Sequence, residues 1–289
     1  MDLGVCVRDL PAAELARLGH EAEALGYTDV FVPDIRGADP DPEAGPLGGR
    51  DAFVSLAAMF QETTTIYGAV GVAAVLFHDP VALALAASTL NEQSDGRFSL
   101  GIGISHAEAA ARAGVPFPDS PLTTMRSWLD DLGRRSRHGM AFGGEWPILV
   151  GALGPRMIEL GASRADGVVL NWLTPAGAAE AVGQVKKAAA EAGANGRTVL
   201  YVRVMPAEGA RADAVNYDAM ANYHKHFAAQ GLTGPDEIVA ATCLDPADPG
   251  RAREQMARYA EAGVDLVCLY PHGWSPAERI DVLTTLAPG

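Results

Sequence analysis

The chain of 289 residues has few cysteines, little positive charge and no long hydrophobic run. Its three cysteines, Cys6, Cys243 and Cys268, are odd in number and far apart, so the sequence predicts neither a disulfide framework nor a cysteine metal site. Its 22 Lys and Arg residues against 36 Asp and Glu residues give a net charge of −14. Because no basic cluster is present to neutralise phosphates, we expect no nucleic-acid partner.

The sequence also lacks the signs of a membrane or exported protein. Its longest apolar stretch, Ala69 to Phe77, is ended by His78-Asp79-Pro80, whereas a membrane helix needs ~20 such residues. The N-terminal MDLGVCVRDLP has no basic segment ahead of a long apolar run, so no signal peptide is expected. With 48% hydrophobic and 20% charged residues, the composition is that of a folded chain. We therefore expect a soluble cytoplasmic protein without a membrane partner.

What is present is a regular alternation of two patterns. Eight short runs are nearly continuously apolar, which is typical of parallel strands buried on both faces. Helical segments fill the gaps, and several begin with proline, whose missing N–H costs no hydrogen bond at the first helical position. The eight runs are 3–7, 28–33, 64–76, 96–104, 147–152, 166–172, 198–205 and 264–270, and the prolines are Pro80, Pro121, Pro155, Pro175 and Pro276.

This alternation predicts an α/β fold of the (β/α)₈ barrel type, which accommodates ~250 residues in one domain, here residues 1–289. Residues 209–245 are too many for a simple connection and look helical, with an apolar face through Tyr217 and Phe227. We expect them to form a helical insertion after strand seven. The segments that follow the strands lie at the C-terminal face, where barrel enzymes hold their chemistry.

Two glycine-containing segments at this face are candidate binding sites. The turn Gly151–Met157, between strand five and a helix, offers backbone N–H groups and Arg156 to an anion, although an ordinary strand-to-helix turn has the same pattern. Strand four ends in Gly103, Ser105 and His106, and its small residues leave room for a flat ligand. His106 can act there as acid or base, the alternative being a solvated or capping histidine.

A third segment, Gly68–Ala74 in strand three, has two glycines within a strand, which indicates either a bulge beside a ligand or tight barrel packing. No metal motif, phosphate-binding Walker loop or Ser-His-Asp order is apparent, so no metal is expected. The mouth of the barrel is predicted to be apolar and to take a small hydrophobic substrate. The residues behind that prediction are Met140, Phe142, Trp146, Trp172 and Trp274.

The segment Asp79–Gly103 resembles the strongest signature of the bacterial luciferase-like superfamily, a helix of small residues followed by Gly96-Arg97-Phe98 and a glycine-rich strand. Gly154-Pro-Arg-Met157 and Ala165-Asp-Gly-Val-Val169 look like two further family motifs in the same order. The chain is most similar to the short F420-dependent oxidoreductase subfamily. There, a Ser-His-Ala segment follows strand four, and an Asn-Tyr helix occupies the insertion.

The resemblance implies a barrel that binds coenzyme F420, or alternatively FMN. The cofactor phosphate would bind the N–H groups from Gly154 to Met157, with Leu153, Pro155 and Arg156 in the same turn. The ring would lie against a bulge or non-proline cis peptide near Val70, Gly71 and Val72, close to Gly103 and Ser105. The resemblance also implies a homodimer and a separate reductase that supplies the reduced cofactor.

The catalytic residues implied are His106 and Asp34. His106 stands where several deazaflavin enzymes of the family carry the carboxylic acid that exchanges a proton with the substrate. Many members have an Asp-His pair after strand two, but this chain reads Asp34-Ile35. The function implied is hydride transfer between reduced F420 and an activated C=C, C=N or C=O group. The alternatives are an FMN-dependent two-component monooxygenase and a flavin-binding barrel without catalysis.

Overall fold

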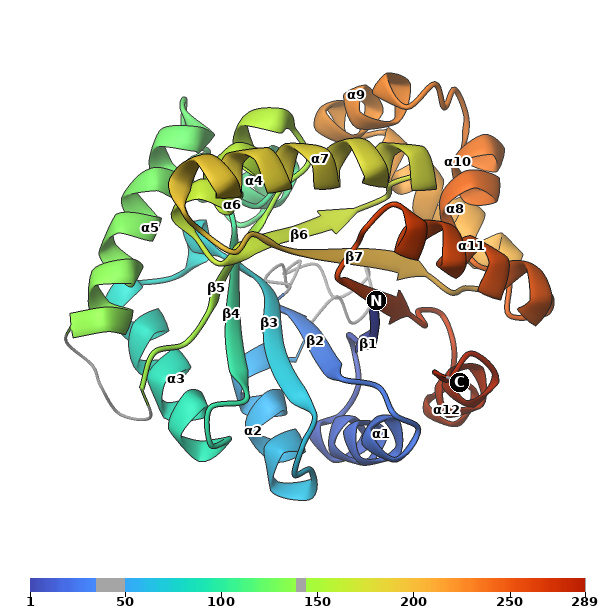
Figure 1. The fold of residues 1–289 in the computed structure, drawn as a ribbon, viewed down its shortest axis with the longest axis horizontal. Helices are drawn as coiled ribbons and strands as arrows, with labels where there is room; N and C mark the ends of the chain where they lie inside the picture. Colours follow the sequence, from blue (N-terminus) through green and yellow to red (C-terminus); the bar gives the residue numbers. More distant parts are fainter. Residues whose placement is uncertain (35–49, 139–143, 289) are drawn as a thin grey trace.

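Eight parallel strands close into a barrel in this computed structural model, which describes residues 1–34, 50–138 and 144–288 (Figure 1). Each strand pairs with the next in the sequence, and β1 closes the ring by pairing with β8. The predicted α/β barrel is therefore confirmed. The strands are β1 (Asp2–Cys6), β2 (Asp29–Asp34), β3 (Tyr67–Ala74), β4 (Phe98–Gly103), β5 (Ile148–Gly151), β6 (Gly167–Asn171), β7 (Arg197–Arg203) and β8 (Leu266–Tyr270).

Helices surround the barrel, and the prolines seen in the sequence stand where helices begin. Side chains cap several of these ends: the carboxylate of Asp79 accepts from the N–H groups of Val81 and Ala82, and the hydroxyl of Thr174 accepts from that of Gly177. The outer helices are α1 (Ala12–Ala24), α2 (Ala52–Glu62), α3 (Pro80–Gln93), α4 (Ala107–Arg112), α5 (Pro121–His138), α6 (Pro155–Arg164), α7 (Pro175–Ala192), α11 (Pro249–Glu261) and α12 (Pro276–Thr285).

Three further helices form the insertion between β7 and α11 and gather at the upper right of Figure 1. They are α8 (Ala207–Asp218), α9 (Ala221–Ala229) and α10 (Pro235–Thr242). Their apolar residues form a cluster of their own, which includes Phe227, Ile238 and the strand-end residue Trp172. The chain then returns to the barrel, where Leu244 pairs with Val204 in an isolated parallel bridge. The helical insertion after strand seven is thus confirmed.

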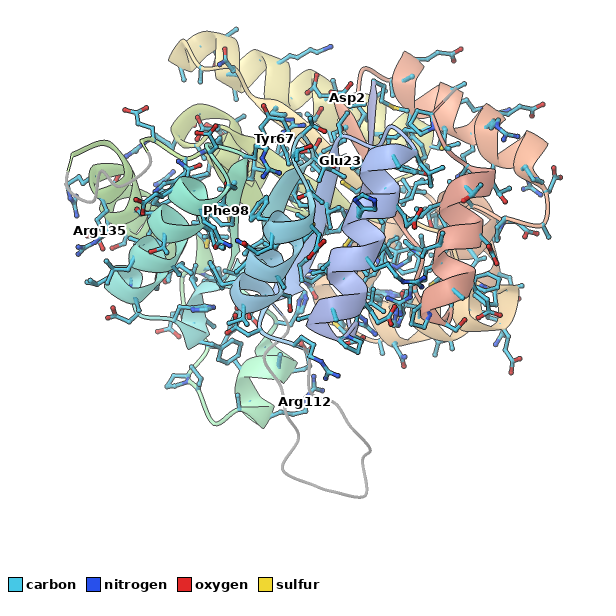
Figure 2. The ribbon with its side chains drawn as sticks, turned by 90° about the horizontal axis from the view of Figure 1, so that it is seen from below. Asp2, Glu23, Tyr67, Phe98, Arg112 and Arg135 are labelled. Atoms are coloured by element: carbon cyan, nitrogen blue, oxygen red, sulfur yellow. The ribbon has the colours of Figure 1, made fainter. Side chains whose placement is uncertain are left out.

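The two ends of the barrel differ, because one carries the starts of the strands and the other their ends. Figure 2 shows Asp2 and Tyr67, which begin β1 and β3, far from Arg112 of α4. At the first end, Glu23 accepts hydrogen bonds from the backbone ahead of β3, the shortest from the N–H of Thr65 at 2.5 Å. Burial opposes ionisation of Glu23, but these hydrogen bonds outweigh it and lower its pKa to about 2.

Candidate active site

A cavity of about 390 Å³ opens at the C-terminal ends of the strands. Strands β2 to β8 and several of the segments that follow them contribute to its wall, as does the segment after β1. This is the face at which the sequence placed the chemistry, because side chains at the carboxyl ends of barrel strands converge on one opening. The strands themselves differ in kind: β3 to β5 contribute glycines and small side chains, and β6 to β8 contribute mostly large polar side chains.

Strand β3 forms one side of the cavity with an irregular backbone. The peptide bond between Gly71 and Val72 is cis, and the pairing register with β4 shifts between Val70 and Ala73. The Tyr201 hydroxyl donates to the Gly71 carbonyl oxygen at 2.9 Å, reaching across the barrel interior from β7. Gly71 and Val72 line the cavity, whereas Val70 is fully buried in the core and does not.

The glycines of β4 and β5 surround the Val72 side chain. A Cβ on Gly103 would lie 2.7 Å from a Val72 methyl carbon, and one on Gly101 would lie 3.0 Å from the other. A Cβ on Gly151 would be 3.3 Å away. The Val72 side chain therefore lies against these glycines, and Val72, Gly103 and Gly151 line the cavity together.

The turn before α6 presents less backbone to a ligand than the sequence suggested. Pro155 has no N–H, and the Met157 N–H donates to the Gly154 carbonyl oxygen at 3.0 Å. Among the described residues, no acceptor takes the N–H groups of Gly154 and Arg156. Leu153, Gly154 and Met157 line the cavity, whereas Pro155 and the Arg156 side chain are exposed outside it. A Cβ built on Gly154 meets no atom within 4 Å.

His106 lies at the cavity wall, at the residue before α4. Its side chain makes no capping hydrogen bond, and its Nδ1 lies 3.5 Å from the Asn222 amide nitrogen. Its ring centroid is 5.5 Å from that of Tyr223, and Ser105 before it has a φ of 74°. Burial lowers the pKa of His106, so the imidazole is neutral at pH 7.

Asp34 has a histidine partner that the sequence did not indicate. Its Oδ2 lies 2.5 Å from Nε2 of His78, which follows β3, and both side chains are over 90% buried, at 3% and 8% exposure. Asp34 also lines the cavity. The sequence excluded a mechanism based on an Asp-His pair of consecutive residues, and Ile35 lies outside the described residues. A pair of the same chemical kind is nevertheless assembled from the end of β2 and the segment after β3.

Sequence reasoning missed the polar residues of β6 to β8. Arg203, fully buried at the end of β7, donates from Nε to Asp213 at 2.8 Å and from Nη1 to the Asn171 side-chain oxygen at 2.6 Å. Its guanidinium carbon lies 3.7 Å from the ring centroid of Trp172. The signal was present, since Arg203 is the one charged residue in the apolar run 198–205. Tyr223, on α9, reaches the same cavity from the insertion.

The prediction that three tryptophans line the mouth of the barrel is wrong. Trp146 is buried and donates to the Ser88 hydroxyl, Trp172 lies beneath Arg203, and Trp274 donates to the Val204 carbonyl oxygen. None of the three lines the cavity, because each packs into the core or onto the backbone. Met140 and Phe142 lie outside the described residues.

The described residues contain neither a metal centre nor a membrane-spanning helix. No group of three or more His, Cys, Asp and Glu side chains in residues 1–34, 50–138 and 144–288 is placed to hold a metal ion. In the same part of the chain, no helix combines the length and apolar character needed to cross a bilayer. All three cysteines are buried free thiols.

Comparison with known proteins identifies the relatives of this chain. The sequence profile of the luciferase-like monooxygenase family matches residues 6–266. The 5,10-methylenetetrahydromethanopterin reductase of Methanolobus tindarius is 27% identical over 253 residues, which cover 82% of this chain and 73% of that protein.

Two solved structures share the whole fold. An F420-dependent secondary alcohol dehydrogenase in complex with an F420–acetone adduct matches with a TM-score of 0.79 at 14% identity, over 99% of this chain and 97% of that one. The oxygenating constituent of 3,6-diketocamphane monooxygenase from Pseudomonas putida, in complex with FMN, matches with a TM-score of 0.72 at 15% identity, over 99% and 97%. At such identities the likeness concerns the fold.

Proposed function

The chain belongs to the luciferase-like monooxygenase family of oxidoreductases, and within it we propose an F420-dependent enzyme that transfers a hydride between reduced deazaflavin and a small substrate. The observation that carries this proposal is the β3 side of the cavity. There the cis Gly71–Val72 backbone, held by Tyr201, faces an opening bounded by the Gly154 turn. The reductase from Methanolobus tindarius and the F420 complex of the alcohol dehydrogenase support the choice of cofactor.

The residues present fit such a cofactor. The space beside Gly154 is open and its N–H has no acceptor among the described residues, so the turn can admit a phosphate beside the N-terminus of α6. The Arg156 N–H is the second free donor there. The ring would lie against Gly71 and Val72, near Gly103 and Ser105. When bound, the deazaflavin supplies or accepts the hydride.

His106 is the group we propose for the proton. Its neutral imidazole can accept a proton from a hydroxyl substrate at pH 7, because burial lowers its pKa. In the direction of reduction, His106 takes up a proton from water and passes it to the substrate oxygen. Asp34, held by His78, faces the same cavity and is the second catalytic candidate.

The decisive experiment is a titration of the protein with F420 and FMN side by side, followed by fluorescence quenching. We expect F420 to bind at least tenfold more tightly, about 1.4 kcal/mol. Tighter binding of FMN would favour the alternative, a monooxygenase that receives reduced FMN from a separate reductase and activates oxygen. The fold shared with the FMN complex from Pseudomonas putida is the observation behind that alternative. Binding of neither cofactor would refute both.

We also propose a homodimer that pairs through α2 and α3. These helices pack against each other, and they expose the large apolar residues Val54, Val81 and Leu85 at 66%, 40% and 44% of their surface. Burying them against a second copy would remove this surface from water. Sedimentation at micromolar concentration should give a species of twice the 30.1 kDa chain mass, and Val54→Asp with Leu85→Asp should convert it to monomer. A monomeric wild type would contradict the dimer.

A further inference from the structure

A chain of hydrogen bonds runs from a buried arginine to a tyrosine hydroxyl at the cavity. Arg203 Nη1 donates to the side-chain oxygen of Asn171 at 2.6 Å, and the Asn171 side-chain nitrogen donates to the Tyr223 hydroxyl oxygen at 3.2 Å. All three residues line the cavity. No described residue accepts the Tyr223 hydroxyl proton. Because its oxygen already accepts from Asn171, this hydroxyl has a hydrogen to donate to a ligand.

Arg203 is held rigidly at the start of this chain. Its side chain is 2% exposed, Asp213 accepts from its Nε at 2.8 Å, and the rings of Trp172 and Tyr217 lie 3.7 Å and 4.9 Å from its guanidinium carbon. Among the described residues, none accepts from its Nη2. A fixed positive charge polarises the hydrogen bonds that follow it, so the Tyr223 hydroxyl becomes a stronger donor.

The position of Tyr223 is suited to donating a hydrogen bond to a substrate, in addition to packing within the protein. Its side chain is 5% exposed, and its ring packs at 4.6 Å from that of Tyr217 and 5.5 Å from that of His106. It therefore lies beside the proton-exchanging group already proposed. Burial raises the pKa of Tyr223, so the hydroxyl keeps its proton across the neutral range.

We propose that Tyr223 and Arg203 bind the substrate oxygen that becomes negative during hydride transfer, so the acceptor is a carbonyl compound rather than an imine. This inference rests on the function proposed above and narrows its substrate class. A hydride adds to the carbonyl carbon, the electron pair of the C=O π bond moves to oxygen, and that oxygen then takes a proton that His106 has first taken up from water. Tyr223 and Arg203 stabilise the negative charge that develops before the proton arrives.

The test uses 4-nitrophenolate as a probe, because its charged oxygen on a flat ring imitates the reduced carbonyl oxygen. Its dissociation constant is measured by absorbance, at a pH where the probe is ionised, with and without F420. Tyr223→Phe keeps the ring and removes only the donor, so phenolate binding should weaken roughly 10- to 100-fold, the worth of a hydrogen bond to a charged group. Nitrobenzene, which lacks the charged oxygen, should bind wild type and variant equally.

Tyr217→Phe is the matched control, because Tyr217 lines the same cavity but stands outside the hydrogen-bond chain. It should bind phenolate as the wild type does. An equal loss in both variants, an unchanged affinity in Tyr223→Phe, or no phenolate binding to the wild type would overturn the proposal. The phenolate titration without F420 distinguishes the failure of this proposal from the failure of the proposed function. If the protein binds no F420 but binds phenolate through Tyr223, the subsite is supported and the proposed function is refuted.

Discussion

The two sides of the cavity are lined by different kinds of residue. The strands β3 to β5 themselves contribute the glycines Gly71, Gly103 and Gly151 with the small side chains of Val72 and Ala74. From β6 to β8 the wall consists of long polar and aromatic side chains, with Arg203 at their centre. The shape of the first side follows from the side chains that its glycines lack. The shape of the second side follows from hydrogen bonds between residues that are distant in the sequence. The side from β3 to β5 therefore suits a cofactor that stays the same from one relative to another. The side from β6 to β8 suits recognition of a particular substrate.

The largest expected effect concerns His106, which stands between the two sides. His106→Ala should keep cofactor binding but lower turnover of the best wild-type acceptor by roughly 10²–10⁴-fold, because the proton then has no positioned acceptor. Steady-state rates and cofactor titration on the same preparation measure the two quantities. His224→Ala is the control, since His224 is exposed and binds Asp218 away from the cavity. Full turnover in His106→Ala would remove this residue from the mechanism.

On the backbone side, Gly71→Ala should destabilise the protein by about 1–3 kcal/mol, the cost of overpacking. The new methyl would overlap the Tyr201 hydroxyl and approach Phe31 to 2.5 Å. Urea unfolding measures the loss, and adding Tyr201→Phe should recover part of it. Gly183→Ala, on the exposed face of α7 with no atom near its Cβ, should instead gain up to ~1 kcal/mol. Equal changes in the free energy of unfolding for Gly71→Ala and Gly183→Ala would contradict the tight packing at Gly71.

Gly154→Leu tests the turn at the other edge of the backbone side. Nothing in the protein obstructs the new side chain, but it fills the space through which the cofactor phosphate would approach. Cofactor affinity should fall at least tenfold, about 1.4 kcal/mol, in a fluorescence titration. Gly234 is a matched control, because it also precedes a proline-initiated helix and has open space around its Cβ. If Gly234→Leu weakened binding as much, the effect would not be local to the cavity.

At neutral pH the smallest effect belongs to His272, on the polar side, because its contribution appears only as the pH falls. Burial and the nearby Arg8 lower the pKa of His272 to about 4, from an ordinary value of 6.5. The unfolded chain therefore binds more protons between these values, and stability falls as the pH drops from about 6.5 to 4. His272→Gln keeps an acceptor for the Arg8 Nη2 at this site and should reduce that slope by up to ~1.4 kcal/mol per pH unit. Urea unfolding over this range would show it; an unchanged slope would contradict it.

The barrel was predictable because its signals are local. Apolar runs of strand length, prolines at helix starts and the surplus of residues 209–245 each report on their own segment. The Gly71–Val72 region could also be located, through glycines within a strand and a family resemblance.

The polar pairs of the site were not predictable, because the two partners in each pair are far apart in the sequence. Asp34 and His78 are 44 residues apart, and Arg203 and Asn171 are 32 apart. Nothing in the neighbourhood of any one of them indicates its partner, since the pairing follows from barrel closure. For the same reason the tryptophans were misassigned: a large aromatic residue near a strand end can point into the core as readily as into the cavity.

The insertion after β7 allows one side of the cavity to change in evolution separately from the other. Helices α8 to α10 leave the barrel after β7 and return at the bridge between Val204 and Leu244, and they pack into a hydrophobic cluster distinct from the main one. Changes among their residues therefore leave the β3 wall untouched, provided that Asp213 keeps its bond to Arg203. Since Tyr223 lies on this insertion, a lineage could change the residues around it and acquire a new ligand preference while it inherits the glycine-rich strands β3 to β5 unchanged.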